Sequence, residues 1–282
     1  MVSDPLSLRL LRYLPKNLIS RAFGKIARLE RPRFLVRRLN RYFANHYGVD
    51  LDAASRPLSD YASLMAFFTR ELKPGLREIA PGAELLVNPV DGRLGISGRI
   101  EEGRLLQAKG LPYSLAALLG SEAAARPFQD GRFLTLYLAP RDYHRIHSPV
   151  AGEIRATLYE PGTLWPVNPP AVARIPSLFA VNERVTCWIE TQNGPVAVVL
   201  VGATNVGSIL LAYHDFATNR GAARARFEHE PPIPIEPGDP LGTFELGSTV
   251  ILLVGHPDFR FDDDLEPEQW RPMGARLGRY PD

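Results

Sequence analysis

Three short segments of the sequence hold residue types that could do chemistry together. They are residues 89–92 with Asp91, residues 143–149 with His144 and His147, and residues 244–251 with Gly247 and Ser248. A carboxylate, an imidazole and a hydroxyl can serve as orienting group, base and nucleophile. Each segment also has an ordinary interpretation: a turn, a pair of unrelated polar histidines, and the start of a strand.

The step from Gly247 to Ser248 suggests a reaction of the chain on itself. Glycine has the least hindered carbonyl of any residue, and the hydroxyl of Ser248 is one residue away from it. If a tight turn bends the backbone, this hydroxyl can attack the Gly247 carbonyl and convert the peptide bond into an ester. Two other classes stay open: a serine hydrolase using Asp91, His147 and Ser248, which would usually need a Gly-x-Ser-x-Gly elbow that is missing here, and a carrier or binding module without catalysis.

The two histidines have alternative interpretations. A zinc site would need a third and a fourth ligand, which this segment does not supply, so no metal is predicted. In a regular strand His144 and His147 would point to opposite faces, and His144 would take no part. A bulge would bring both rings to one pocket, with His147 as a base and His144 as its neighbour.

The elements that must position these groups are mostly short strands. Runs rich in Val, Ile and Leu, separated by Gly and Pro, predict strands at 94–100, 133–138, 153–159, 185–190, 196–201, 208–213 and 249–254. Helices are expected at 61–72 and 114–125. The fold class is therefore α+β, with N-terminal amphipathic helices followed by a β-rich catalytic domain.

A weak internal repeat supports this organisation. Residues 88–94 resemble residues 148–154, and both copies predict a turn leading into a strand. Together with residues 237–242, the pattern is similar to the barrel-sandwich hybrid folds of lipoyl and biotinyl domains, although no carrier lysine lies in the required hairpin.

The N-terminal segment is strongly basic. Residues 1–48 hold 11 Lys and Arg and 2 acidic residues, a net charge of +9. The remaining residues hold 22 Lys and Arg and 29 acidic residues, a net charge of −7, so the total of +2 hides a strong asymmetry. Three amphipathic helices are expected there: one around Leu6 to Leu14, one with an apolar stripe over 18–26, and one over 35–46. Such helices can lie on an anionic membrane, or they can form a helical subdomain with Arg on its solvated side. Nucleic-acid binding is not expected, because no binding motif accompanies the charge.

Composition limits the remaining classes. The sequence has 45% hydrophobic and 23% charged residues, which is typical of a globular protein. Its one cysteine, Cys187, excludes an internal disulfide and is expected to be a buried packing residue. The longest apolar runs are too short to span a bilayer, and no secretory signal is evident. We therefore expect an intracellular protein with peripheral membrane contact.

Several motifs in fixed order resemble a known family. Residues 89–92, 143–149 and 246–249 are similar to the three signature sites of phosphatidylserine decarboxylase proenzymes, in their long bacterial form. Further agreement comes from residues 67–75, 109–115, 166–169, 182–185 and 201–209. The resemblance runs from about Leu14 to Gly255.

The resemblance implies a chemistry and assigns residues to it. The chain would cut itself between Gly247 and Ser248, with Ser248 as nucleophile, His147 as base and Asp91 as the orienting carboxylate. Ser248 would become a pyruvoyl group at the start of a small subunit, 248–282, which stays with a large subunit, 1–247. This pyruvoyl cofactor would form a Schiff base with phosphatidylserine and accept electrons as carbon dioxide leaves. His144 is a candidate proton donor or substrate-positioning residue.

The resemblance also implies an arrangement in the cell. Residues 1–60 would form the membrane-association region and residues 61–282 the catalytic domain. The substrate's acyl chains stay in the bilayer, so the enzyme would work at the cytoplasmic side of the cell membrane as a peripheral protein. A homodimer of processed units is expected.

Overall fold

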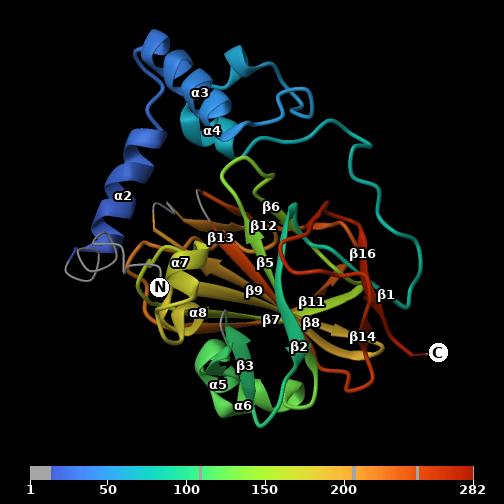
Figure 1. The fold of residues 1–282 in the computed structure, drawn as a ribbon. Coiled ribbons are helices and arrows are strands. Elements are labelled where there is room, and N and C mark those ends of the chain that lie inside the picture. Colours follow the sequence, from blue (N-terminus) through green and yellow to red (C-terminus); the bar gives the residue numbers. More distant parts are fainter. Residues whose placement is uncertain (1–13, 108–109, 205–207, 246–247, 282) are drawn as a thin grey trace.

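The N-terminal part of the molecule is helical. The computed structural model describes residues 14–107, 110–204, 208–245 and 248–281. Its first elements are α2 (Lys16–Ala27), α3 (Arg33–Tyr47), the 3₁₀ turn η1 (Leu58–Asp60) and α4 (Leu64–Phe68). Gly48 ends α3 in the left-handed conformation, with φ of 67°, which glycine adopts without strain. A small apolar core around Phe67 and Phe68 joins α3 to α4, and Figure 1 shows these two helices next to each other.

An eight-stranded antiparallel sheet forms the body, in the order β11-β7-β8-β9-β13-β5-β2-β15. In that order the strands are Ala225–Ile235, Gly152–Glu160, Arg184–Thr191, Gly194–Gly202, Ser248–Val254, Arg132–Leu138, Gly92–Arg99 and Trp270–Arg271. Every residue of β13 is buried. This strand reads as an almost continuous apolar run because both of its faces are covered.

Short helices cover one face of the large sheet. They are α5 (Leu115–Leu119), α6 (Glu122–Ala125), η3 (Arg126–Phe128), α7 (Pro169–Val172) and α8 (Leu178–Val181). Their apolar side chains pack against alternate residues of the central strands, including Val199 and Ile251. In Figure 1 they lie on the lower and left sides of the sheet.

Two small sheets contribute to the core on the other face. One has the order β10-β12-β6, with strands Ile209–Leu211, Pro240–Phe244 and Arg145–His147. The other has the order β1-β16-β14, with strands Leu85–Val87, Arg276–Arg279 and Arg260–Phe261. A separate hairpin pairs β3 (Arg104–Gln107) with β4 (Leu111–Ser114). Val250 and Leu252 of β13 face the core shared with the small sheets, so β13 is covered on both sides.

The two repeated segments meet in space. The amide of Val87 donates to the carbonyl of Pro149, and the amide of His147 donates to the carbonyl of Pro89, both at 2.9 Å. Val90 and Val150 occupy equivalent places in the repeat and are both buried in the core. As predicted, each copy leads into a strand, β2 or β7. This pairing places the turn that carries Asp91 beside the strand that carries His147.

The mixed α+β class is confirmed, with two corrections to the helices. The helix expected over 61–72 is only five residues long, and Ser63 caps its start by accepting from the Ala66 amide. The helix expected over 114–125 is split into α5 and α6, because Gly120 turns left-handed and Ser121 caps a new start. The helix expected around Leu6 to Leu14 lies outside the described residues, apart from Leu14.

The helices α2 and α3 match the expected ranges, but each leaves most of its large apolar side chains exposed. The buried positions of α2 are Lys16, Ser20, Gly24 and Ala27, and its apolar stripe is exposed. The exposed apolar side chains of the two helices are Leu18, Ile19, Phe23, Ile26, Phe34, Leu35, Leu39 and Tyr42. None of the described helices is long and apolar enough to cross a membrane.

The basic face expected on α2 is exposed, and two of its arginines also contact the body. The guanidinium of Arg21 donates to Asn219, and Arg28 forms an ion pair with Glu245. Arg21, Lys25 and Arg28 are all exposed, which agrees with a helical subdomain that has Arg on its solvated side. Cys187, by contrast, is buried in β8 as predicted, and burial raises the pKa of its thiol to about 12.

Candidate active site

Ser248 is the first residue of β13 and lies at the centre of the large sheet. It is paired with Leu138 of β5 on one side and with Gly202 of β9 on the other. Its side chain is fully buried, and its hydroxyl has no hydrogen-bond partner among the described residues. Folded proteins rarely bury an unpaired hydroxyl, because the lost hydration costs about 1–3 kcal/mol. Leu246 and Gly247 lie outside the described residues.

His147, in β6, is held by both ring nitrogens. Its Nδ1 lies 2.7 Å from the carbonyl oxygen of Gly238, which can only accept, so Nδ1 carries the proton. Its Nε2 then accepts from the hydroxyl of Tyr143 at 3.0 Å. Burial lowers the pKa of His147, against the opposing effect of the Gly238 carbonyl. The ring is therefore neutral at pH 7, with its lone pair on Nε2.

Asp91 is buried and is bound to an arginine. Its carboxylate accepts from Arg77 through Nε at 2.7 Å and through Nη2 at 2.5 Å, and from the amide of Met273 at 2.8 Å. The described contacts include no hydrogen bond between Asp91 and His147, or between His147 and Ser248. Asp91 still acts on the histidine at longer range, because its charge raises the pKa of His147.

His144 lies just before β6 and is completely buried. Its Nδ1 donates to the carbonyl of Asp142 at 2.9 Å, its ring centroid is 4.0 Å from that of Phe68, and its Nε2 has no described partner. Burial is the main reason that the pKa of His144 falls to about 3, with the positive charge of Arg70 as a further cause. A register irregularity does occur nearby, but it lies in β12, where Leu241 is unpaired opposite His147 and Ile146.

The turn between β5 and β6 contains Asp142, a residue without an expected role, and links Ser248's neighbour in β5 to His144. The carboxylate of Asp142 accepts from the amide of Ala139 at 2.7 Å and from the indole of Trp270 at 3.2 Å. Burial raises the pKa of Asp142. The buried Arg70 donates to the carbonyls of Arg141 and Asp142. The turn is thus held rigidly between Leu138, opposite Ser248, and His144.

Some of these supporting residues lie in motifs of the sequence, and others do not. Arg70 and Tyr143 lie inside segments that resemble the family, at 67–75 and 143–149, so their roles could have been considered. Arg77 and Trp270 lie outside all of the motifs. Their contacts with Asp91 and Asp142 depend on the tertiary structure.

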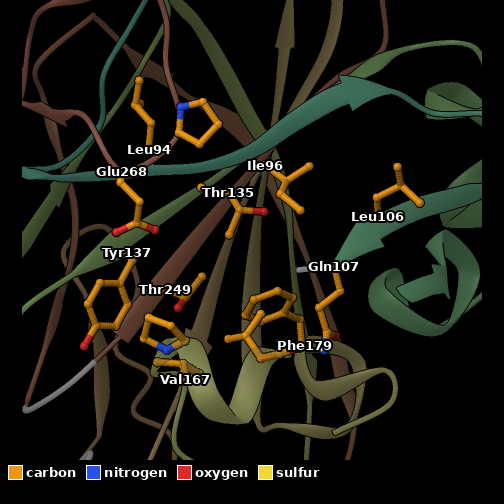
Figure 2. A pocket seen from close by; sticks show the side chains of 14 residues that line it. Leu94, Ile96, Leu106, Gln107, Thr135, Tyr137, Val167, Phe179, Thr249 and Glu268 are labelled. Atoms are coloured by element: carbon orange, nitrogen blue, oxygen red, sulfur yellow. Dashed lines mark hydrogen bonds between the residues drawn. The ribbon is translucent and has the colours of Figure 1, made fainter. Parts of the chain in front are cut away.

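Two cavities lie close to these residues. One, of about 130 Å³, is mostly apolar and includes Thr249, the neighbour of Ser248. In Figure 2 its labelled polar side chains include Thr135, Gln107 and Glu268, while Phe179 and Val167 form part of an apolar wall. The second, of about 270 Å³, lies beside Asp91 and Arg77 and includes Arg70 and Asp142. Among the residues that the structure describes, no group of three or more His, Cys, Asp and Glu is placed to hold a metal ion.

The α+β body carries a buried serine hydroxyl, a buried carboxylate and two histidines, residue types that enzymes use for catalysis. The family model described as "Phosphatidylserine decarboxylase" matches residues 64–279. The chain belongs to the phosphatidylserine decarboxylase family.

Similar proteins match along almost their whole length. The chain is 48% identical over 281 residues to the "Phosphatidylserine decarboxylase proenzyme" of Anaeromyxobacter sp. (strain K), which covers 98% of this chain and 99% of the relative. It is 43% identical to the protein of the same name from Myxococcus xanthus, over 98% and 99% of the two chains. It is 42% identical to that of Shewanella amazonensis, over 99% and 100%.

Proposed function

We propose that this chain is a proenzyme that cuts itself between Gly247 and Ser248 and then converts phosphatidylserine to phosphatidylethanolamine and carbon dioxide. Membership of the family supports the reaction. The observation that carries the assignment to this serine is the buried, unpaired hydroxyl of Ser248 at the start of the central strand.

In the cleavage step, Ser248 is the nucleophile and His147 is the base. The Oγ of Ser248 bonds to the Gly247 carbonyl carbon, the peptide C–N bond breaks, and the serine nitrogen gains a proton. His147 suits this transfer because it is neutral and its Nε2 is the basic atom. Tyr143 holds that atom in the structure, so its hydroxyl must turn aside before His147 reaches the serine.

Asp91 contributes its charge to the same step. Its oxygens already accept hydrogen bonds from Arg77 and Met273, so it supports His147 through its field rather than through a direct bond. A negative charge nearby stabilises the imidazolium that forms when His147 takes the proton. The ester then eliminates across the Cα–Cβ bond of residue 248, and hydrolysis of the product releases ammonia.

The surroundings of residue 248 fit the pyruvoyl group that the family implies. A polar atom is buried there without a partner, and the cavity at Thr249 begins at the next residue. When present, the group supplies a carbonyl that reacts with the substrate amine and accepts electrons as carbon dioxide leaves. His144 is neutral and its Nδ1–H is already used, so its free Nε2 is an acceptor. We therefore assign His144 to positioning the substrate; donation of a proton, its other expected role, would require a proton on Nε2.

The membrane association belongs to the same proposal. The exposed stripes of α2 and α3 include Leu18, Ile26, Phe34 and Tyr42, all more than half exposed. Apolar side chains of this kind can enter the interface of an anionic bilayer, with basic residues near its headgroups. This supports a peripheral membrane protein, and the cytoplasmic side of the cell membrane is part of the same proposal. The homodimer of processed units also remains a proposal, to be tested by the mass of the processed protein in solution.

Intact-mass measurement of the purified protein tests the self-cleavage. We expect two fragments, 1–247 and 248–282, with borohydride adding hydrogen only to the smaller one. Ser248→Ala should leave one folded, uncleaved and inactive chain. An intact chain with full decarboxylase activity, or a free serine amine at residue 248 in the active protein, would overturn the mechanism. An intact chain that hydrolyses esters would favour the serine hydrolase.

A further inference from the structure

A further cavity lies between α2 and the body, away from Asp91 and His147. It has a volume of about 630 Å³. One wall is the face of α2 that carries Arg21, Lys25 and Arg28, spaced to lie along one side of a helix. The opposite wall includes Arg220 and Glu245. In Figure 1, α2 extends from the region of α3 and α4 towards the side of the β-rich body.

The cavity is strongly cationic. Four basic side chains line it against the single carboxylate of Glu245, a balance of +3. Glu245 is already paired with Arg28. Arg21 uses its Nε on the carbonyl and side-chain oxygens of Asn219, at 3.0 and 3.1 Å. Within the described part of the chain, neither Lys25 nor Arg220 forms an ion pair with a carboxylate. A cleft with this surplus of positive charge concentrates anions.

The chemistry of the lining suits a phosphate oxygen. Arginine presents a planar set of N–H donors that matches phosphate geometry, and lysine adds a compact charge. Ser208 and Thr218 also line the cavity, but their hydroxyl groups already form hydrogen bonds within the protein. The Ser208 hydroxyl donates to the Thr218 carbonyl, and the Thr218 hydroxyl accepts from the Ile209 amide.

The position of the cavity points to a lipid as the source of that phosphate. Leu18 lines the cavity and is 63% exposed, and Ile26 on the same helix is 56% exposed. A bilayer that accepted these side chains would place its phosphate groups at the level of the basic residues. Free phosphate would gain nothing from the apolar stripe.

The cavity also lies within reach of the proposed reactive residue. Glu245 is three residues before Ser248, and three residues span at most about 10 Å. In a phosphoserine headgroup only four bonds separate the phosphorus from the amine. We propose that this cavity binds the phosphodiester of phosphatidylserine, so that the headgroup amine can approach residue 248. This inference rests on the proposed function for the identity of the lipid.

Binding measured on an uncleavable protein tests the proposal without using the decarboxylase reaction. On a Ser248→Ala background, short-chain soluble phosphatidylserine is titrated and followed by phosphorus NMR. Lys25→Gln with Arg220→Gln removes two cavity charges and breaks no described ion pair. We expect this variant to bind the lipid at least tenfold more weakly. Arg104→Gln with Arg126→Gln removes two exposed charges elsewhere and should bind like the parent.

The outcomes separate the possible errors. Unchanged lipid binding in the cavity variant would overturn the proposal, and so would equal weakening in the control pair. If inorganic phosphate binds at least as tightly as the lipid, the site takes free phosphate and the lipid assignment is wrong. If the wild-type protein shows no decarboxylation but the cavity variant still loses lipid binding, the proposed reaction fails and this site stands. Self-cleavage of the cavity variant with Ser248 restored confirms that it folds.

Discussion

The ion pair between Arg77 and Asp91 allows the structural and chemical roles of Asp91 to be separated. Arg77→Met removes both guanidinium hydrogen bonds and leaves the buried carboxylate with the Met273 amide. The side chain of Asp91 is 3% exposed and that of Arg77 is 19% exposed. Removing one partner of a buried pair costs about 3–5 kcal/mol, and we expect the lower end because water can reach the arginine site.

The assay is urea unfolding on a Ser248→Ala background, which prevents cleavage from altering the measurement. With a slope of about 3 kcal/mol per molar for a chain of this size, the midpoint should fall by about 1 M. Arg99→Met removes an exposed arginine at the opposite end of β2 and should change the free energy of unfolding by less than about 0.5 kcal/mol. A loss below about 1 kcal/mol for Arg77→Met would refute the view that this pair anchors Asp91.

The double variant Arg77→Met with Asp91→Asn decides what the carboxylate does. It removes both charges, so at least half of the lost stability should return. If the charge of Asp91 supports His147, this double variant with Ser248 restored should fail to cleave itself although its stability has recovered. If it cleaves at the wild-type rate, Asp91 is only the partner of Arg77 and leaves the proposed triad.

Three further predictions concern the histidines and the exposed helix face. His147 can act as a base only when it is neutral, and burial lowers its pKa below 6.5. A histidine with a pKa of 6.5 would be about one-tenth neutral at pH 5.5, so the self-cleavage rate at that pH should exceed one-tenth of its high-pH value. An inflection of the cleavage rate above pH 6.5 would contradict this. The pKa of His144 is about 3 in the folded chain, so the unfolded chain binds its proton first as the pH falls below about 6.5. Stability should then fall by up to about 1.4 kcal/mol per pH unit down to about pH 3, and His144→Gln should reduce the slope of urea midpoints against pH; an unchanged slope would mean that His144 is accessible to protons. Leu18→Ser with Ile26→Ser should weaken sedimentation with anionic vesicles at least tenfold while self-cleavage continues, and unchanged sedimentation would place the membrane contact elsewhere.

The sequence predicted the central strands well because their signal is local. Residues 250–254 and 196–201 are apolar without interruption, and the strands that contain them are buried and close to the expected bounds. The longest strand, β11, was missed because it contains Pro231 and Pro232 and many charged residues. The structure explains its tolerance of proline, because β11 is an edge strand whose register shifts between Glu228 and Ile233.

Motifs in the sequence identify the candidate residues, but they do not identify the groups that hydrogen-bond to them. The ring of His147 is fixed by the carbonyl of Gly238, which is 91 residues away in the sequence. Asp91 accepts from the amide of Met273, 182 residues away. A backbone group at that distance has no sequence signature of its own. The direct bond from Asp91 to His147 that a serine triad would have is replaced in the described structure by the bond to Arg77.

The position of β13 has a consequence for how the processed protein could refold. A cut before Ser248 would leave a 35-residue fragment whose first strand lies between β5 and β9, and whose later strands β15 and β16 pair with β2 and β1 of the other fragment. The two pieces would interlock through several strands, so they should stay together without a covalent link. Folding of the precursor is a reaction of one chain, whereas refolding after the cut would be an encounter between two chains and would depend on their concentration. The small piece alone has no partner for either side of its apolar strand and should aggregate when released. Denaturation would therefore be reversible before the cut and largely irreversible after it. The processed enzyme would then depend on having folded as a single chain before the cut.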